Sequence, residues 1–69
     1  MTPKERELLQ GMANCYKACH ATFEETVGMV GSARGLTSAE VKEMLERLKH
    51  EGGEEYMALR RKLPGDFPL

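Results

Sequence analysis

The stretch Leu36-Thr37-Ser38-Ala39-Glu40-Val41 marks the start of a helix and the corner around which the chain is organised. Thr37 stands three residues before Glu40, so its hydroxyl can accept from the Glu40 backbone N–H while the Glu40 carboxylate accepts from the Thr37 N–H. Leu36 and Val41 occupy the two positions of a hydrophobic staple around this capping box. The stretch therefore predicts a helix that begins at this point.

Downstream of the corner, the spacing of apolar residues predicts two short helices. The first runs from residue 37 to about residue 50, where Gly52-Gly53 stops it. The second covers about 54–63 and ends at Pro64-Gly65. The tail that follows is expected to pack back onto the domain through Phe67. The apolar stripe of the first of these helices is made by Val41, Met44, Leu45 and Leu48.

Upstream of the corner, the sequence predicts one long helix over about 3–30. Thr2, Pro3 and Glu5 form a helix start with a capping residue, a proline at the first turn and a carboxylate three residues after the cap. Apolar residues then recur at spacings of three and four. Gly31 or Gly35 is expected to end the helix. The stripe comprises Leu8, Met12, Cys15, Cys19, Phe23, either Thr26 or Val27, and Val30.

These elements predict a single all-α domain over residues 1–69, with a long N-terminal helix packed against two shorter ones. The outline of the two shorter helices is also that of a helix-turn-helix. Because the long helix has about twice as many residues as either short helix, part of its apolar stripe should remain exposed to solvent in the monomer. We therefore expect a homodimer or a protein partner, bound through an apolar surface made by Leu8, Met12, Tyr16, Cys19 and Phe23.

Composition narrows the classes of function. The 69 residues include 10 basic and 11 acidic side chains, a net charge of −1, so no overall charge favours nucleic acid or an anionic membrane. No apolar run approaches the roughly 20 residues that span a bilayer, and the N-terminus lacks the apolar core of a signal peptide. We expect a cytoplasmic protein without a membrane partner. So short a chain builds a marginal core, which is a second reason to expect association.

The stretch of sequence best suited to metal binding or redox chemistry contains Cys15, Cys19 and His20. Two thiols four residues apart on one helix face, with a neighbouring imidazole, could supply soft metal ligands, and His50 could add a fourth. The simpler interpretation is that both thiols lie in the apolar stripe and act as small core residues. We therefore expect no metal site and no cofactor, and we keep metal or redox chemistry as the alternative.

Arg60, Arg61 and Lys62 form the main basic cluster, and they support nucleic-acid binding as an alternative function. In a helix-turn-helix, the third helix would be the recognition element and these residues its phosphate contacts. Glu54 and Glu55 weaken this interpretation because they place negative charge at the start of that helix. Basic residues in a last helical turn also complement the helix dipole without any ligand.

Catalysis finds no support in the sequence. No pair of carboxylates is forced together, no serine has a base at a recognisable spacing, and the closely spaced glycines follow a helix rather than a strand. A domain of this size rarely encloses a substrate-sized cavity. We therefore expect no enzyme, no catalytic residue and no small-molecule substrate. The leading prediction is a small non-catalytic protein-interaction or regulatory module that self-associates.

Overall fold

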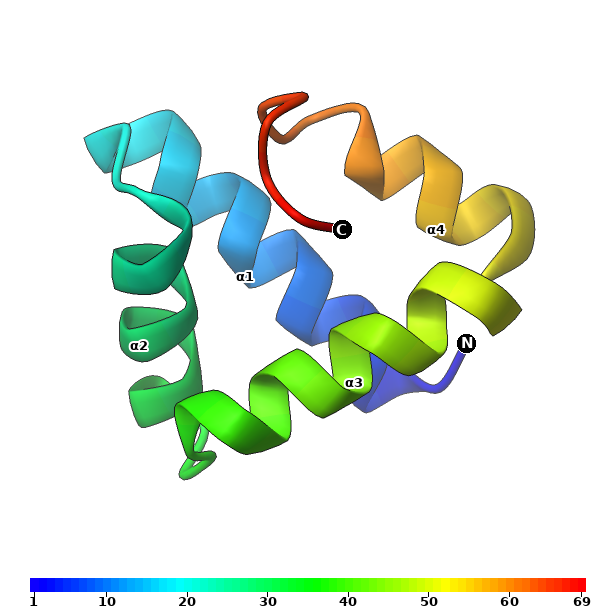
Figure 1. Cartoon of the computed structure of the whole chain (residues 1–69), viewed down its shortest axis with the longest axis horizontal. Coiled ribbons are helices and arrows are strands. Elements are labelled where there is room, and N and C mark those ends of the chain that lie inside the picture. Colours follow the sequence, from blue (N-terminus) through cyan, green and yellow to red (C-terminus); the bar gives the residue numbers. More distant parts are fainter.

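The computed structural model describes all 69 residues and contains four helices and no strands. They are α1 (Pro3–Cys19), α2 (Phe23–Ala33), α3 (Ser38–Glu51) and α4 (Gly53–Arg60), arranged around a common centre (Figure 1). The prediction of an all-helical chain is confirmed, whereas the prediction of three helices is wrong. No helix is both long enough and apolar enough to cross a membrane.

The helix expected over 3–30 is interrupted at His20, whose left-handed backbone (φ 52°, ψ 36°) ends α1. Two residues later Thr22 starts α2 with its own capping box. The Thr22 N–H donates to a carboxylate oxygen of Glu25 at 3.0 Å, and the Glu25 N–H donates to the Thr22 hydroxyl at 3.2 Å. Because a left-handed residue cannot continue a right-handed helix, the chain turns and α2 packs back onto α1 (Figure 1).

Capping boxes also open α1 and α3, at Thr2–Glu5 and Thr37–Glu40. The predicted end of the last helix moves from about residue 63 to Arg60, since the chain passes into turns there. At the corner between α2 and α3, Gly35 has a φ of 70°, a conformation that suits glycine. The four helix starts and the three left-handed positions, His20, Gly35 and Gly53, set the path of the chain.

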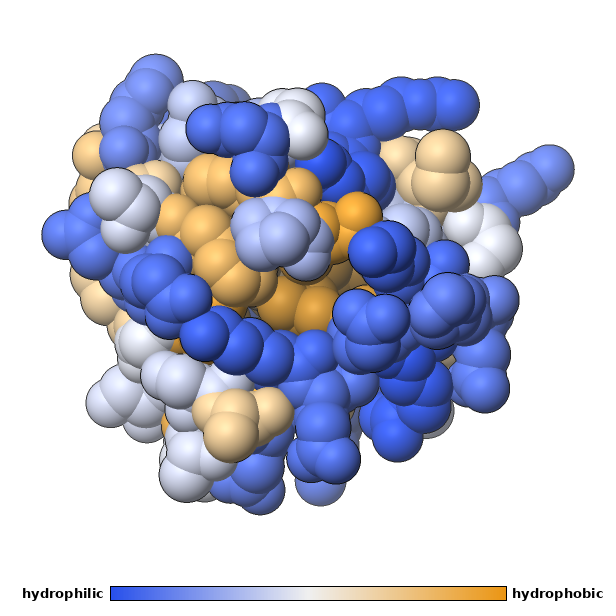
Figure 2. Space-filling view, in the orientation of Figure 1, coloured by the Kyte–Doolittle hydropathy of each residue, from blue (hydrophilic) through white to orange (hydrophobic).

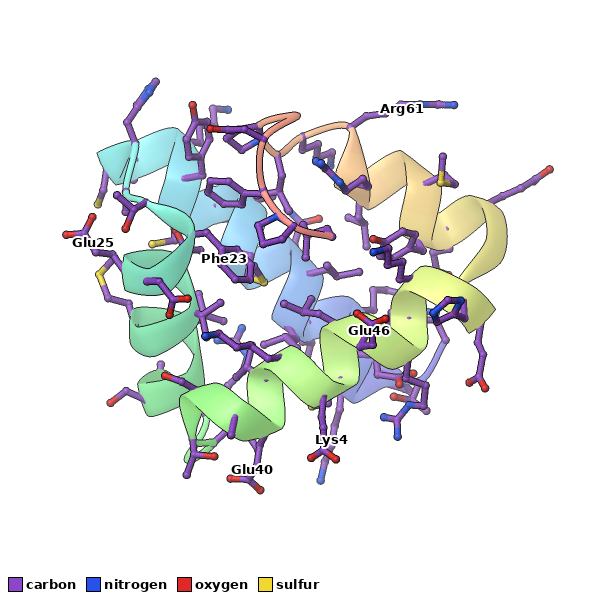
Figure 3. All side chains as sticks on the ribbon, in the orientation of Figure 1. Lys4, Phe23, Glu25, Glu40, Glu46 and Arg61 are labelled. Atoms are coloured by element: carbon purple, nitrogen blue, oxygen red, sulfur yellow. The ribbon has the colours of Figure 1, made fainter.

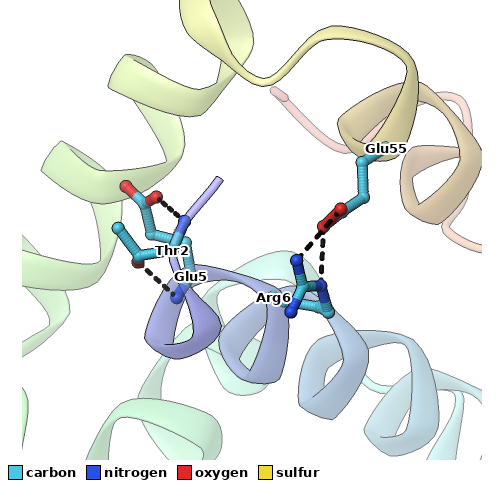
Figure 4. Close-up of polar contacts among 4 residues, drawn as sticks. All are labelled: Thr2, Glu5, Arg6 and Glu55. Atoms are coloured by element: carbon cyan, nitrogen blue, oxygen red, sulfur yellow. Dashed lines mark hydrogen bonds and ion pairs between the residues drawn. The ribbon is translucent and has the colours of Figure 1, made fainter.

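Two ion pairs join α1 to the helices that close the fold. Glu5 receives the Thr2 backbone N–H at 2.8 Å within its capping box and an N–H of Arg47 from α3 at 3.0 Å. Arg6 donates to both carboxylate oxygens of Glu55 on α4, at 2.6 and 3.2 Å (Figure 4). These pairs fix the N-terminal half of α1 against α3 and α4, on the side of the molecule where the chain begins.

All four helices and the C-terminal tail contribute to one core. Leu8, Leu9 and Met12 of α1 are fully buried at its centre. α2 contributes Val27 and α3 contributes Val41 with no exposed surface. The other core residues are Ala13, Val30, Leu45, Leu48, Tyr56, Leu59, Leu63 and Phe67. The core-facing apolar residues of α1 are thus buried within the chain, because α2 turns back and covers them.

Candidate protein-interaction face

The broad face of the molecule carries an apolar hollow, which we call the front hollow. Figure 2 shows hydrophobic side chains gathered at the centre of this face and hydrophilic side chains around them. The hollow has a volume of about 280 Å³ and lies between α2, α3 and the tail. Its lining residues are Phe23, Glu24, Lys42, Leu45, Glu46 and Pro68.

Phe23 enters the front hollow because it is the first residue of α2, placed just after the left-handed turn at His20. Its side chain points toward the centre of the broad face (Figure 3). Leu45 reaches the hollow from the buried side of α3, and exposed Pro68 closes it from the tail. Three segments that are distant in sequence therefore supply its apolar floor.

The tail holds its position through Arg60 at the end of α4. One terminal guanidinium nitrogen donates to the carbonyl oxygens of Leu63 and Pro64, at 3.3 and 2.8 Å. The other donates to the carbonyl oxygens of Gly65 and Phe67, at 3.2 and 3.1 Å. A charged donor forms stronger hydrogen bonds than a neutral one, so Arg60 fixes the path of residues 63–67 without help from regular structure.

Phe67 is the apolar anchor of the tail and is 7 % exposed. Its ring meets Tyr16 edge to face with centroids 5.7 Å apart, and meets Phe23 in the same manner at 5.5 Å. Such arrangements are favourable because the positive ring edge faces the negative ring face. Phe67 thus joins α1 to the start of α2, and it supports Phe23 from behind the front hollow.

Charges of both signs surround the front hollow. Lys42 of α3 forms an ion pair with Glu24 of α2, with Nζ 2.8 Å from the carboxylate oxygen. Glu46 lies one turn further along α3, near the middle of the broad face (Figure 3), and its carboxylate is 3.3 Å from the His50 ring. All four side chains are largely exposed, so each pair adds little to stability. Their arrangement matters more for what can dock there.

The five residues predicted to bind a partner fall into three environments. Leu8 and Met12 have no exposed surface, so in this fold they are core residues and a partner cannot reach them. Tyr16 and Phe23 are half-buried against Phe67. Cys19 is exposed at the end of α1. The correction follows from the break at His20, which lets α2 cover the stripe that a continuous helix would have left open.

The thiols also depart from the expected core position. Cys15 is half-buried and Cys19 is exposed, while the His20 ring lies against Tyr16 at a tilt of 43°, with ring centroids 5.0 Å apart. Burial raises the pKa of Cys15, the nearby Cys19 raises it further, and the Thr26 hydroxyl opposes both. Nowhere do three His, Cys, Asp or Glu side chains come together as a metal-binding group. His50 bonds to Glu46 instead of joining the cysteines.

The basic cluster is divided by the fold. Arg60, predicted as a phosphate contact in the alternative function, donates its hydrogen bonds to carbonyl oxygens of the tail in this structure. Arg61 is exposed and points away from the body of the molecule (Figure 3). Lys62 lines a hollow of about 510 Å³ together with Lys17 and His20, and no carboxylate lines it. The C-terminal ends of α1 and α4 lie near these cations, so the cations also complement the helix dipoles.

Of the residues that line the front hollow, only Phe23 was among the predicted partner-binding residues. The signal that could have found them is the placement of Lys42 and Glu46 around Leu45 on one side of the α3 stripe. Pro68 could not be placed, since its position depends on the Arg60 contacts. Comparison with protein families, with curated proteins and with solved structures finds no match.

Proposed function

We propose that this chain is a small non-catalytic protein-interaction module that self-associates by placing the front hollow of one copy against that of another. The observation that carries the proposal is the front hollow, where half-buried Phe23 and exposed Pro68 lie over buried Leu45 on the broad face and charged side chains surround them. An apolar centre with a polar rim is the usual anatomy of a protein interface.

The mixed rim favours a second copy as the partner. A two-fold symmetric interface uses the same surface patch on both copies, so that patch must be complementary to itself. A rim of one sign would then repel itself. Here Lys42 and Glu46 bring both signs to the same edge of the hollow, so a cation of one copy can face an anion of the other.

The size of the face supports the same partner. The molecule extends 26 by 23 Å across the broad face and 18 Å along the direction perpendicular to it. A dimer of standard size buries about 800 Å² from each partner, so an interface of that size would involve the whole of one broad face. The thin core of a 69-residue chain also gains from association.

The experiment compares two charge insertions by light scattering during gel filtration. Pro68→Glu places a carboxylate on the floor of the front hollow, at an exposed position that no core residue depends on. Met57→Glu makes the same chemical change at an apolar side chain that is 51 % exposed on α4, outside the hollow. The wild-type chain and Met57→Glu should both run as dimers at high micromolar concentration, and Pro68→Glu as a 7.7 kDa monomer.

Circular dichroism of both variants confirms that they fold. A wild-type chain that stays monomeric at millimolar concentration would contradict the proposal. So would a dimer that Met57→Glu disrupts and Pro68→Glu leaves intact, since that result would place the interface on α4.

Nucleic-acid binding is a second candidate, supported by the hollow that Lys17, His20 and Lys62 line without a carboxylate. Arg60 is not counted among these cations, because it donates its hydrogen bonds to the tail. A mixed-sequence duplex titrated at low and moderate salt tests it: phosphate contacts give an affinity that falls steeply with salt. Lys17→Ala and Lys62→Ala should each reduce the slope, whereas absence of binding at low salt would rule this function out.

A further inference from the structure

Cys15 and Cys19 form a pair of thiols on one face of the last turn of α1. Residues four apart on a helix have Cβ atoms about 5–6 Å apart, so Cys15 and Cys19 are neighbours on the surface of α1. Cys19 is exposed and Cys15 is half-buried, so solvent and ions can reach the pair. No other cysteine is present in the chain.

Thr26 of α2 supplies an independent observation at the same place. Its side chain is fully buried, and its hydroxyl has no hydrogen-bond partner. The Thr26 hydroxyl also acts on Cys15, since it lowers the pKa of that thiol. A buried hydroxyl without a partner carries a free-energy cost, and folded proteins satisfy nearly all such groups. A thiolate at Cys15 would be a stronger acceptor for it than a thiol.

We propose that Cys15 and Cys19 bind one soft, low-coordinate metal ion of the Cu(I) type, with the Thr26 hydroxyl donating to the metal-bound Cys15 sulfur. Two thiolates select soft ions. Zinc prefers four ligands, and no third His, Cys, Asp or Glu joins this pair. Hydrogen bonds from outside the ligand set commonly orient metal ligands, which gives the orphaned Thr26 hydroxyl a role.

The binding step involves no electron transfer. Two S–H bonds break, two Cu–S bonds form, and two protons pass to solvent, which leaves a bis-thiolate complex with a net charge of −1. This inference is independent of self-association because metal is counted per chain.

The experiment titrates the reduced full chain with Cu(I) under anaerobic conditions, in competition with bicinchoninate, a chromogenic Cu(I) chelator. We expect one tightly held ion per chain. Cys15→Ser and Cys19→Ser should each weaken binding by at least tenfold, because one thiolate cannot chelate. Thr26→Val keeps the shape of the side chain, removes its hydroxyl, and should weaken binding by about tenfold.

Two controls separate a site from adventitious thiol chemistry. The double variant Lys17→Cys, Cys19→Ser keeps two thiols but moves one to the far side of the helix, so it should bind no better than Cys19→Ser. His20→Asn removes the neighbouring imidazole, retains a residue that tolerates the left-handed backbone, and should leave the affinity unchanged. Circular dichroism checks the fold of each variant.

The proposal is overturned if the wild-type chain binds Cu(I) no more tightly than the Lys17→Cys, Cys19→Ser variant. Equal binding by Thr26→Val would overturn the role of its hydroxyl. A loss of affinity in His20→Asn as large as that in Cys19→Ser would replace the two-thiol site by one that includes the imidazole.

Discussion

The Arg60 guanidinium donates to the carbonyl oxygen of Phe67 at 3.1 Å, seven residues further along the chain. This contact couples the end of α4 to the aromatic residue that joins α1 and α2. Arg60, which in the sequence is part of a basic cluster, therefore holds the C-terminal tail in place; we call this set of contacts the Arg60 clamp. The tail, and with it the front hollow, depends on it.

Replacing Arg60 should destabilise the fold far more than replacing its neighbour. Arg60→Ala removes four hydrogen bonds from a charged donor to carbonyl oxygens and should lower the free energy of unfolding by about 2 kcal/mol. Arg61→Ala, at an exposed position without such contacts, should change it by less than about 0.5 kcal/mol. Urea unfolding followed by circular dichroism measures both. Equal effects of the two substitutions would refute the clamp.

Thr26→Val should stabilise the apoprotein. The substitution removes a fully buried hydroxyl that has no hydrogen-bond partner and replaces it with a methyl group of similar size. The gain in the free energy of unfolding should be about 1 kcal/mol. The converse change at the next residue, Val27→Thr, buries a new hydroxyl and should destabilise by a similar amount. A stabilised variant that binds Cu(I) less tightly would show that Thr26 is retained for a ligand; a destabilised Thr26→Val would mean that the hydroxyl is satisfied in solution.

Alanine should behave differently at Gly11 of α1 and Gly28 of α2. A Cβ at Gly28 would meet nothing within 4 Å, so Gly28→Ala should stabilise by up to about 1 kcal/mol through helix propensity. A Cβ at Gly11 would lie 2.7 Å from a guanidinium nitrogen of Arg34, which donates to the Glu7 carbonyl oxygen at 3.0 Å. Gly11→Ala must displace Arg34, so its gain should be smaller or absent.

A double-mutant cycle measured by urea unfolding tests this explanation of Gly11. In the Arg34→Ala background the obstacle is gone, and Gly11→Ala should recover the full gain expected from helix propensity. An effect of Gly11→Ala that is the same in both backgrounds would contradict it.

Stability should decline in acid because of the capping boxes. The backbone N–H groups of Thr2, Thr22 and Thr37 donate to Glu5, Glu25 and Glu40, and in each case this lowers the carboxyl pKa below its usual value. The unfolded chain then binds more protons than the folded one as the pH falls. These carboxylates contribute fully to the free energy of unfolding above their pKa in the unfolded chain, about 4.3. The contribution is lost as the pH falls through their lower pKa in the folded chain.

The free energy of unfolding should thus be nearly constant between pH 7 and about pH 5.5 and then fall below about pH 5. The measurement is urea unfolding over this range. Glu25→Gln and Glu40→Gln should each flatten the acid limb, whereas Glu43→Gln, which removes a carboxylate that caps no helix, is the control. An acid limb unchanged by the first two substitutions would show that the capping carboxylates are not its source.

The helix starts were predictable from sequence, but one was overlooked. Thr2–Glu5 and Thr37–Glu40 were recognised from a threonine three residues before a glutamate, and Thr22–Glu25 has the same pattern. It was overlooked because apolar spacing continues across it, from Cys19 through Phe23 to Val27. Periodicity reports which side chains face the core, and two helices that share a core can keep a common phase across a break.

The candidate site was less accessible to sequence reasoning than the helices. Phe23 was selected for a reason that the fold overturns, namely a stripe left open by a continuous helix. The Arg60 contacts are formed to carbonyl oxygens of an irregular tail, and no residue pattern specifies such contacts. The same holds for Thr26, since an unsatisfied hydroxyl is defined only by its surroundings in three dimensions.

The most direct test of self-association through the front hollow is a dilution series of amide NMR spectra, from about 1 mM to about 10 µM. We expect concentration-dependent shifts concentrated at Phe23, Glu24, Lys42, Leu45 and Glu46, and none in the same range for Pro68→Glu. Spectra that are identical at all concentrations, with the tumbling time of a 7.7 kDa monomer, would contradict it.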